Sequence, residues 1–233
     1  MNKIHLSSVD STNTYLKNNY QELNNYTFVS SDKQTAGRGR NSREWKSENG
    51  KNLLFSLLIL DKELIKHFKE ISIITAYSLI QELEELEINN LMIKWPNDVF
   101  VGDRKIAGVL LESVTKEEME SLIVGVGLNV NQMEFIGDYN IAPTSINKEL
   151  NKEIVLEDLK DKIYKRLIDN LEKLKENHDF YPYIIKYDYL KGKTAYTETK
   201  EVKIKGINKD YSLSIYNKDT IENIEAGEIS FHK

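Results

Sequence analysis

Residues 52–60 of this 233-residue chain are almost entirely apolar, which predicts a β-strand buried on both faces. Such a strand needs a sizeable core, and the rest of the chain supplies one. Apolar residues recur at helical spacing over 62–87 and 156–174, and Asp10 or Ser11 is suited to cap a first helix that ends near Leu23. Further strands are predicted at 26–31, 91–95, 98–101, 105–112 and 122–130.

The pattern changes near Tyr187, where we expect a domain boundary. Beyond it, short alternating segments are separated by the turn-like stretches 206–210 and 217–219, as in a small all-β barrel. The alternating apolar pairs are Val202 and Ile204, Leu213 and Ile215, and Ile229 and Phe231.

Composition excludes several classes of function. A net charge of −5 argues against general attraction to nucleic acid, and no apolar run approaches the roughly 20 residues that cross a bilayer. The amino terminus lacks the apolar core of a signal peptide, and zero cysteines exclude disulfides and thiolate chemistry. The four histidines are scattered, so a metal site is not predicted. These features fit a cytoplasmic protein without a membrane partner.

A polar connection of about 20 residues joins two predicted strands and is longer than loops in compact domains usually are. It contains Gly37-Arg38-Gly39-Arg40, in which glycines allow close approach to a ligand and guanidiniums can pair with anionic oxygens. A solvated loop is the alternative. Trp45 favours a binding role, because its indole can stack on a purine ring, although it could also pack on the protein itself.

Lys94-Trp95-Pro96-Asn97-Asp98 ends one strand and begins a hairpin whose turn is Gly102-Asp103. Polar groups at strand ends often line clefts, although Asn97-Asp98 could simply start a turn. Lys105 lies on the return arm. Regular alternation would place Lys105 and Ala107 on one face of that strand and Ile106 and Gly108 on the other. The alternative is a surface lysine that covers apolar groups with its stem, which is the commoner role for a single lysine beside an apolar strand.

Two more segments suit a ligand site. Glycines at 125 and 127, followed by Asn129 and Asn131, suggest close approach of a ligand or of another backbone, with a simple bulge as the alternative. Ser11-Thr12-Asn13 could contact a ligand or could only cap the first helix.

The order of these motifs resembles that of the biotin protein ligases, over nearly the whole chain. The matching runs are Asp10-Ser-Thr-Asn-Thr-Tyr-Leu16, Gln34-Thr-Ala-Gly-Arg-Gly-Arg40 with Arg43 and Trp45, Lys94-Trp-Pro-Asn-Asp98, Arg104-Lys-Ile-Ala-Gly108 and Gly125-Val-Gly-Leu-Asn129. Residues 206–230 resemble the family's small carboxy-terminal domain. The resemblance implies an α+β fold: a mixed β-sheet with packed helices over 1–187, as in class II aminoacyl-tRNA synthetases, and an SH3-like β-barrel over 188–233.

The resemblance also implies a reaction. Biotin and ATP form biotinyl-5′-AMP and pyrophosphate, and a lysine of the biotin carboxyl carrier protein of acetyl-CoA carboxylase then takes the biotinyl group. Fixed cations and Mg²⁺ would offset the charge that builds up when a carboxylate attacks a phosphate. The implied biotin contacts are Ser11, Thr12, Asn13 and Gln34, and the implied contacts to biotin or its adenylate are Arg38, Gly39 and Arg40. Lys105 corresponds to the essential lysine, Trp45 and Asn129 to adenine contacts, and Asp98 to a polar group near ATP and magnesium.

Two departures from the family pattern matter. Asn41-Ser42 stands where many relatives carry a glycine-containing segment. The motifs begin at Asp10, which leaves no room for the amino-terminal helix-turn-helix of some relatives, so we expect no DNA binding and no repressor activity. The family includes monomers and dimers, and a homodimer is therefore possible.

Two other functions compete with the biotin ligase interpretation. A lipoate ligase shares the general fold and the adenylate chemistry, but the arginine-glycine loop together with residues 94–98 favours biotin. A non-enzymatic nucleic-acid binder with an arginine-rich loop is disfavoured by the acidic charge balance.

Overall fold

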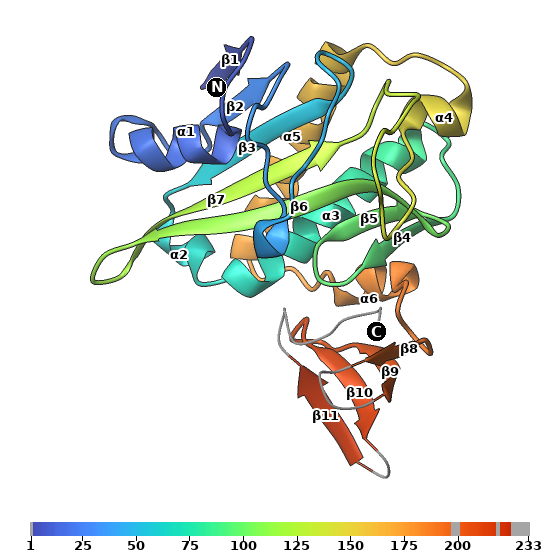
Figure 1. Ribbon diagram of the computed structural model, residues 1–233. Coiled ribbons are helices and arrows are strands. Elements are labelled where there is room, and N and C mark those ends of the chain that lie inside the picture. The colour runs from blue at the N-terminus through green and yellow to red at the C-terminus, as the bar shows by residue number, and fades with distance from the viewer. Residues whose placement is uncertain (1, 197–200, 218–219, 225–233) are drawn as a thin grey trace.

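The computed structural model describes residues 2–196, 201–217 and 220–224, which form two β-sheets (Figure 1). The larger sheet has the spatial order β1-β2-β3-β7-β6-β5-β4. Only β1 and β2 pair in parallel, so the sheet is mixed, as expected. Its strands are β1 (Lys3–Leu6), β2 (Phe28–Ser31), β3 (Leu53–Ile59), β4 (Leu91–Lys94), β5 (Asp98–Val101), β6 (Arg104–Thr115) and β7 (Met119–Leu128).

The central strand β3 is buried at every residue, which confirms the prediction for residues 52–60. It lies between β2 and β7, and its side chains enter two separate cores. Phe55 and Leu57 join the large core, whereas Leu58 packs with Leu16 and Ile123 in a smaller one on the opposite face. The apolar character of β3 on both faces thus reflects two covering layers.

Helices cover the two faces of the sheet unequally (Figure 1). The long helices α3 (Phe68–Glu85) and α5 (Leu156–Lys175) pack against each other and close the large core. The short helix α1 (Thr12–Asn19) lies on the other face and buries Leu16 there. Much of the α1 face is therefore left to loops. The remaining helices are α2 (Lys62–Ile65), α4 (Ile146–Leu150) and α6 (Tyr181–Ile184), with 3₁₀ turns at Tyr20–Glu22, Arg40–Ser42 and Ile185–Tyr187.

One long helix was predicted to occupy most of residues 62–87, and α3 does so, but a separate short helix, α2, precedes it. Asp61 Oδ1 accepts the N–H groups of Glu63 and Leu64 and starts α2. The N–H of His67 then bonds to the carbonyl of Leu64 and ends the first helix before α3 begins. Phe68, which belonged to the predicted apolar stripe, is 41% exposed as a result.

The start of α1 also differs from the prediction. The Ser11 side chain makes no capping hydrogen bond, and Asp10 Oδ1 accepts only the N–H of Ser11, at 2.6 Å. Gln34 Oε1 instead accepts the N–H of Thr12 at 2.8 Å. A side chain from the long loop therefore completes the helix end. Strand β1 was not predicted, because four alternating residues give too short a signal.

A β-bulge in β6 overturns the predicted alternation around Lys105. Val99 pairs with Ala107 and Phe100 pairs with Lys105, so Ile106 is an extra residue without a partner on β5. A Cβ atom at Gly108 would lie only 3.1 Å from Lys105 Nζ. Lys105 therefore faces the same side as Gly108, while Ile106 and Ala107 both enter the large core.

The second sheet, in the order β11-β10-β9-β8, is antiparallel throughout its described pairs. Val202, Ile204, Leu213 and Ile215 are buried as their alternation predicted. Its strands are β8 (Thr194–Tyr196), β9 (Glu201–Ile207), β10 (Leu213–Asn217) and β11 (Thr220–Ile224). Ile229 and Phe231, the predicted last strand, lie outside the described residues, as do positions 218–219 of the predicted turn. No helix in the described ranges has both the length and the apolar character to cross a bilayer.

Candidate active site

Three glycines remove side chains from the α1 face of the large sheet. Gly108 pairs with Gly127 across β6 and β7, and Gly125 lies two residues before Gly127 on β7. A Cβ atom at Gly125 would lie 2.3 Å from Asn13 Oδ1, and one at Gly127 would lie 2.4 Å from the Trp45 ring. These glycines thus allow Asn13 and Trp45 to lie directly on the strand backbone. The sequence suggested close approach of a ligand or of another backbone, whereas here two side chains approach.

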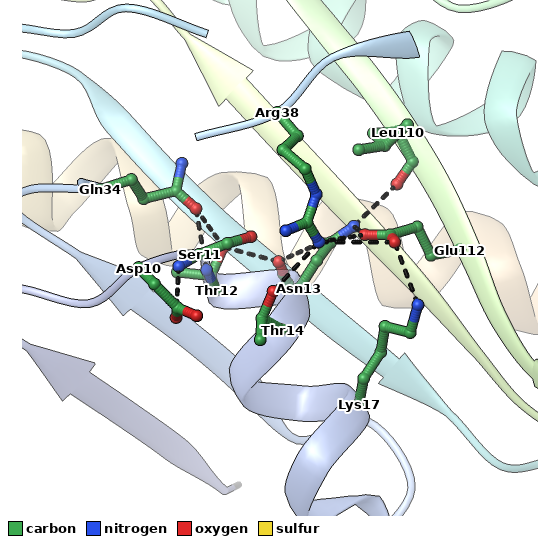
Figure 2. Close-up of polar contacts among 11 residues, drawn as sticks. Asp10, Ser11, Thr12, Asn13, Thr14, Lys17, Gln34, Arg38, Leu110 and Glu112 are labelled. Atoms are coloured by element: carbon green, nitrogen blue, oxygen red, sulfur yellow. Dashed lines mark hydrogen bonds and ion pairs between the residues drawn. The ribbon is translucent and has the colours of Figure 1, made fainter. Parts of the chain in front are cut away.

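Residues 11–13 form a buried polar cluster with the long loop and β3 (Figure 2). Gln34 Oε1 accepts hydrogen bonds from both the N–H and the hydroxyl of Thr12, at 2.8 and 3.1 Å. Ser56 Oγ lies 2.5 Å from Asn13 Oδ1 and 2.7 Å from Thr12 Oγ1. Ser11 is 3% exposed. The three residues are therefore part of an assembled site as well as of a helix start.

Arg38 lies beside this cluster and is held by side chains of α1 and β6 (Figure 2). Its Nη2 donates to Thr14 Oγ1 at 3.0 Å and to Glu112 Oε2 at 3.2 Å. Glu112 also accepts from Asn13 Nδ2 at 2.8 Å and Lys17 Nζ at 3.2 Å. Burial by itself raises the pKa of Glu112, but the Asn13 and Lys17 hydrogen bonds and the Lys17 and Arg38 charges outweigh it, and the pKa is lowered.

A second group of polar side chains lies around Lys105, which the bulge directs to the face of the sheet that carries Gly108 and Gly127. Its Nζ lies 2.8 Å from Asp98 Oδ1 and 5.5 Å from the centroid of the Trp45 ring, a cation–π distance. Asp98 Oδ1 accepts no hydrogen bond from the described residues, so the contact with the ammonium is an ion pair without hydrogen-bond geometry. The carboxylate thus keeps acceptor capacity for another partner.

Arg40 approaches from the loop toward the end of β4. Its Nη1 donates to Asn97 Oδ1 at 3.2 Å, and Asn97 Nδ2 donates to the carbonyl of Val109 at 2.7 Å. Burial lowers the pKa of Arg40 while the charge of Asp98 opposes this, and an arginine keeps its charge at neutral pH. The next residue, Asn41, has φ of 54°, a conformation that glycine and asparagine adopt most readily, which accounts for its place in this turn.

Asn129 closes the site from β7. It is 4% exposed, and its Nδ2 donates to the carbonyl of Thr144 at 3.0 Å. Thr144 in turn donates its N–H to the carbonyl of Lys105 at 2.8 Å, so the segment after β7 runs beside Lys105. The Asn129 Oδ1 atom is buried without a partner.

Buried polar atoms without a partner concentrate here. In the described part of the chain, Trp45 Nε1, Asp98 Oδ1 and Asn129 Oδ1 make up three of the four such side-chain atoms, and Ser121 Oγ is the other. Native proteins leave few polar groups unsatisfied, so we take this cluster as a candidate ligand site. Within the described ranges no group of three or more histidines and acidic residues suits a metal ion.

Residues 6–129, more than half of the chain, match the model of the biotin/lipoate A/B protein ligase family. The chain belongs to this family. The matched segment contains all eleven predicted site residues and ends at the last of them, Asn129.

The chain is also similar to individual proteins that are named as ligases. The chain is 34% identical to the bifunctional ligase/repressor BirA of Bacillus subtilis over 152 residues, which are 64% of this chain and 46% of that protein. It is 33% identical to the biotin–[acetyl-CoA-carboxylase] ligase of Paracoccus denitrificans over 54% of this chain and 53% of that protein. The chain thus matches only about half the length of these relatives.

Solved structures cover more of the chain. The biotin protein ligase from Aquifex aeolicus in complex with biotin and ATP is 31% identical, with a TM-score of 0.86 over 98% of this chain and 97% of that one. The α+β fold of the large sheet and its helices is therefore the fold of the biotin protein ligases.

The structure brings the predicted residues into two adjoining groups. One group contains Ser11, Thr12, Asn13, Gln34 and Arg38, and the other contains Arg40, Trp45, Asp98, Lys105 and Asn129. Gly39 donates its N–H to the carbonyl of Arg43 at 2.7 Å and closes the loop turn between them.

Sequence reasoning missed Ser56, Glu112 and Thr144, whereas Asn97 was noted at the strand end but was given no role in the site. Two of these had a visible signal. Ser56 interrupts an otherwise apolar strand, and Glu112 follows Gly108 and Leu110 at the two-residue spacing of one strand face.

Proposed function

We propose that the chain is an ATP-dependent biotin protein ligase. It forms biotinyl-5′-AMP from biotin and ATP with release of pyrophosphate, and then transfers biotin to a lysine of the biotin carboxyl carrier protein of acetyl-CoA carboxylase. Family membership supports this proposal, as does the likeness to an Aquifex aeolicus ligase solved with biotin and ATP. The acceptor is inferred from the name of the Paracoccus denitrificans relative.

Three unpartnered buried polar atoms carry the proposal, because they lie on residues gathered around a fixed cation. Trp45 Nε1, Asp98 Oδ1 and Asn129 Oδ1 provide one donor and two acceptors near Lys105. A nucleotide offers complementary groups: an aromatic ring, ring nitrogens, an amino group and a phosphate chain. We assign the adenine to Trp45 and Asn129, with the indole face covering the base.

Biotin occupies the neighbouring polar cluster in this proposal. Its ureido group has two N–H donors and a carbonyl acceptor, and Ser11, Thr12, Asn13 and Gln34 present hydroxyl and amide groups that suit both roles. The glycine at position 125 gives Asn13 its place on the sheet. The arginine-glycine segment of Arg38, Gly39 and Arg40 then lies beside the biotin carboxylate and the adenylate.

The chemistry follows from this arrangement. A carboxylate oxygen of biotin attacks the α-phosphorus, and the bond to the bridging oxygen of pyrophosphate breaks. Two anions meet in this step, so fixed cations lower its barrier by positioning and by electrostatic stabilisation. Lys105 and Arg40 supply that charge. Mg²⁺ enters as part of the ATP substrate, and the open oxygen of Asp98 suits an ion that keeps water and phosphate ligands.

The second step needs no covalent bond to the enzyme. The uncharged amine of the acceptor lysine attacks the biotinyl carbonyl carbon, AMP leaves with the bonding electron pair, and the amine loses a proton. Water competes with that amine for the adenylate. The loop that carries Arg40 and Trp45 covers the site and limits this hydrolysis.

The remaining parts of the proposal concern the whole chain. Residues 1–187 form the catalytic domain, and residues 188–233 form an SH3-like domain, for which the antiparallel sheet β8 to β11 gives support. The protein acts in the cytoplasm and does not bind DNA, in keeping with its acidic charge.

One assay tests the function. The protein is incubated with ATP, Mg²⁺ and either biotin or lipoate, and the acyl-adenylate and its transfer to a carrier domain are measured by mass spectrometry. We expect biotinyl-5′-AMP and a biotinylated carrier. Adenylate from lipoate alone would make the chain a lipoate ligase, and no adenylate from either acid would overturn the enzyme assignment. A gel shift with biotin operator DNA tests the absence of DNA binding.

A further inference from the structure

Glu112 is the meeting point of three separate parts of the site (Figure 2). It projects from β6 and accepts hydrogen bonds from Asn13 at the start of α1, from Lys17 one turn later, and from Arg38 of the loop. Its side chain is 19% exposed. None of the other described carboxylates joins this loop to α1.

The charges at this point are arranged to keep Glu112 ionised. Asn13 and Lys17 donate to its two oxygens and, with the charge of Arg38, hold its pKa below the ordinary value despite its partial burial. Hydrogen bonds to an ionised carboxylate are shorter and stronger than neutral ones. Glu112 can therefore fix the orientation of both the Asn13 amide and the Arg38 guanidinium.

The Asn13 amide has its direction set by this contact. Its Nδ2 is committed to Glu112, so its Oδ1 points toward Ser56, 2.5 Å away. Rotating the amide by half a turn would face its NH₂ group toward the hydroxyl and its oxygen toward the carboxylate. Glu112 thus determines which atom of Asn13 faces the polar cluster.

The loop is fixed at two points by this arrangement. Gln34 is joined to Thr12, and the N–H of Ala36 bonds to the carbonyl of Asp10 at 2.8 Å. Four residues later along the chain from Gln34, Arg38 is joined to Glu112 and Thr14. The part of the loop that precedes Arg40 and Trp45 is therefore anchored to α1 by side chains at both of its ends.

We propose that Glu112 is a positioning residue, which holds Asn13 and Arg38 in the geometry that binds biotin and which anchors the start of the arginine-glycine loop. It acts through those two residues and need not touch the reacting atoms. This proposal rests on the biotin ligase function for its kinetic consequences. Its structural part, the anchoring of the loop, holds whatever the reaction is.

The test compares Glu112→Gln with the wild-type protein. Glutamine keeps the size of the side chain but replaces one acceptor oxygen with a donor. We expect the Kd and KM for biotin to rise by about tenfold, the loss of one charge-assisted hydrogen bond. The kcat for adenylate formation at saturating biotin should change by less than about threefold, because Lys105 and Arg40 keep their contacts.

Hydrogen exchange without any ligand provides a second readout. The amides of Thr35, Ala36, Gly39 and Trp45, which are bonded within the loop or to its neighbours, should exchange faster in Glu112→Gln. The amides of β3 and β7 should exchange at wild-type rates. Faster exchange throughout the protein would mean a general loss of stability and would overturn the positioning role.

Two further variants make the test specific. Lys17→Met removes a donor to Glu112 that is not part of the loop, and should change each readout by less than about twofold. Arg38→Met removes the loop donor and leaves β6 intact, so it tests the anchor even if Glu112→Gln fails to fold. The double variant Glu112→Gln/Arg38→Met should have a Kd for biotin no higher than that of the more impaired of its two single variants.

The outcomes separate the two proposals. A wild-type protein that makes no biotinyl-adenylate would overturn the proposed function, while the exchange of the loop amides would still report on the anchor. Wild-type biotin affinity together with wild-type loop exchange in Glu112→Gln and Arg38→Met would overturn the role of Glu112.

Discussion

The indole N–H of Trp95 donates a 2.7 Å hydrogen bond to the main-chain carbonyl of Tyr211, which joins the two sheets of the protein. Trp95 is 6% exposed and immediately follows β4, three residues before Asp98. Tyr211 lies in the turn before β10, with φ of 62°. The smaller sheet is therefore in direct contact with a strand end that leads into the site.

Trp95→Phe removes this hydrogen bond and leaves the carbonyl of Tyr211 without its partner. We expect a loss of about 1–2 kcal/mol in the free energy of unfolding, measured with urea, and a higher KM for ATP. Tyr181→Phe is the matched control, because the Tyr181 hydroxyl also bonds to the second sheet, at Ile207 O, 3.1 Å away. An equal change of KM in both variants would contradict a specific role of Trp95.

Lys105→Ala should reduce biotinyl-adenylate formation by at least about a hundredfold, because it removes a fixed cation from the step in which two anions meet. The fold should persist, as judged by circular dichroism and by the urea midpoint. Lys66→Ala, which removes an exposed lysine paired with Glu63, is the control. Near-normal turnover in Lys105→Ala would contradict a role of the Lys105 charge in adenylate formation and would favour the alternative of an ordinary surface lysine.

Arg40→Gly should release the adenylate faster, since the substitution removes a guanidinium from the loop over the site. We expect biotinylation of unrelated proteins added to the assay, detected on a streptavidin blot. Arg104→Gly, at the far hairpin turn where Arg104 pairs with Glu149, should retain the adenylate. Unchanged retention in Arg40→Gly would argue against Arg40 as a clamp.

Gly125→Ala and Gly127→Ala should affect different substrates. The added methyl group would meet Asn13 at 2.3 Å in the first case and Trp45 at 2.4 Å in the second, and one of the two must move. We expect weaker biotin binding in Gly125→Ala and weaker ATP binding in Gly127→Ala, each by about tenfold or more. Calorimetry with each ligand tests this, and each variant serves as the control for the other. Equal losses for both ligands would contradict the division of the site.

Lys94 provides a test against pH. Burial lowers its pKa from 10.5 to about 8. Between these values the unfolded chain holds a proton that the folded chain lacks, so the contribution of Lys94 to stability rises with pH. Lys94→Met should be more stable than wild type at about pH 7, and this advantage should shrink by about pH 9.5. Urea unfolding at both values measures it, and a constant difference would contradict the prediction.

Much of the fold could be predicted because its strands and helices have strong local patterns. The almost entirely apolar β3 and the apolar stripe of α5 each fit one type of secondary structure far better than the other. The candidate site residues were predicted from motifs that have a recognisable order along the chain. For most of these residues, physical reasoning from the single residue could not distinguish a ligand contact from an ordinary structural role.

The parts that were not predicted depend on contacts between distant segments. The side chain that accepts the N–H of Thr12 at the start of α1 belongs to Gln34, which lies 22 residues further along the chain. The break between α2 and α3 arises where the N–H of His67 bonds to Leu64, although the apolar spacing continues through it. The spacing of Glu112 from Gly108 places it on the site face of β6 but does not reveal its role, because its three partners lie 74 to 99 residues away.

The bulge at Ile106 has a consequence for redesign of this sheet. Building the strand so that every residue is kept and Ile106 takes a place in the ladder would give β5 and β6 regular alternation, which most design rules would count as an improvement. It would also turn the ammonium of Lys105 away from Gly108 and toward the apolar core, where a charge is costly. A version of this protein with such ideal strands should therefore fold less well, and it should lose the cation that we propose for adenylate formation.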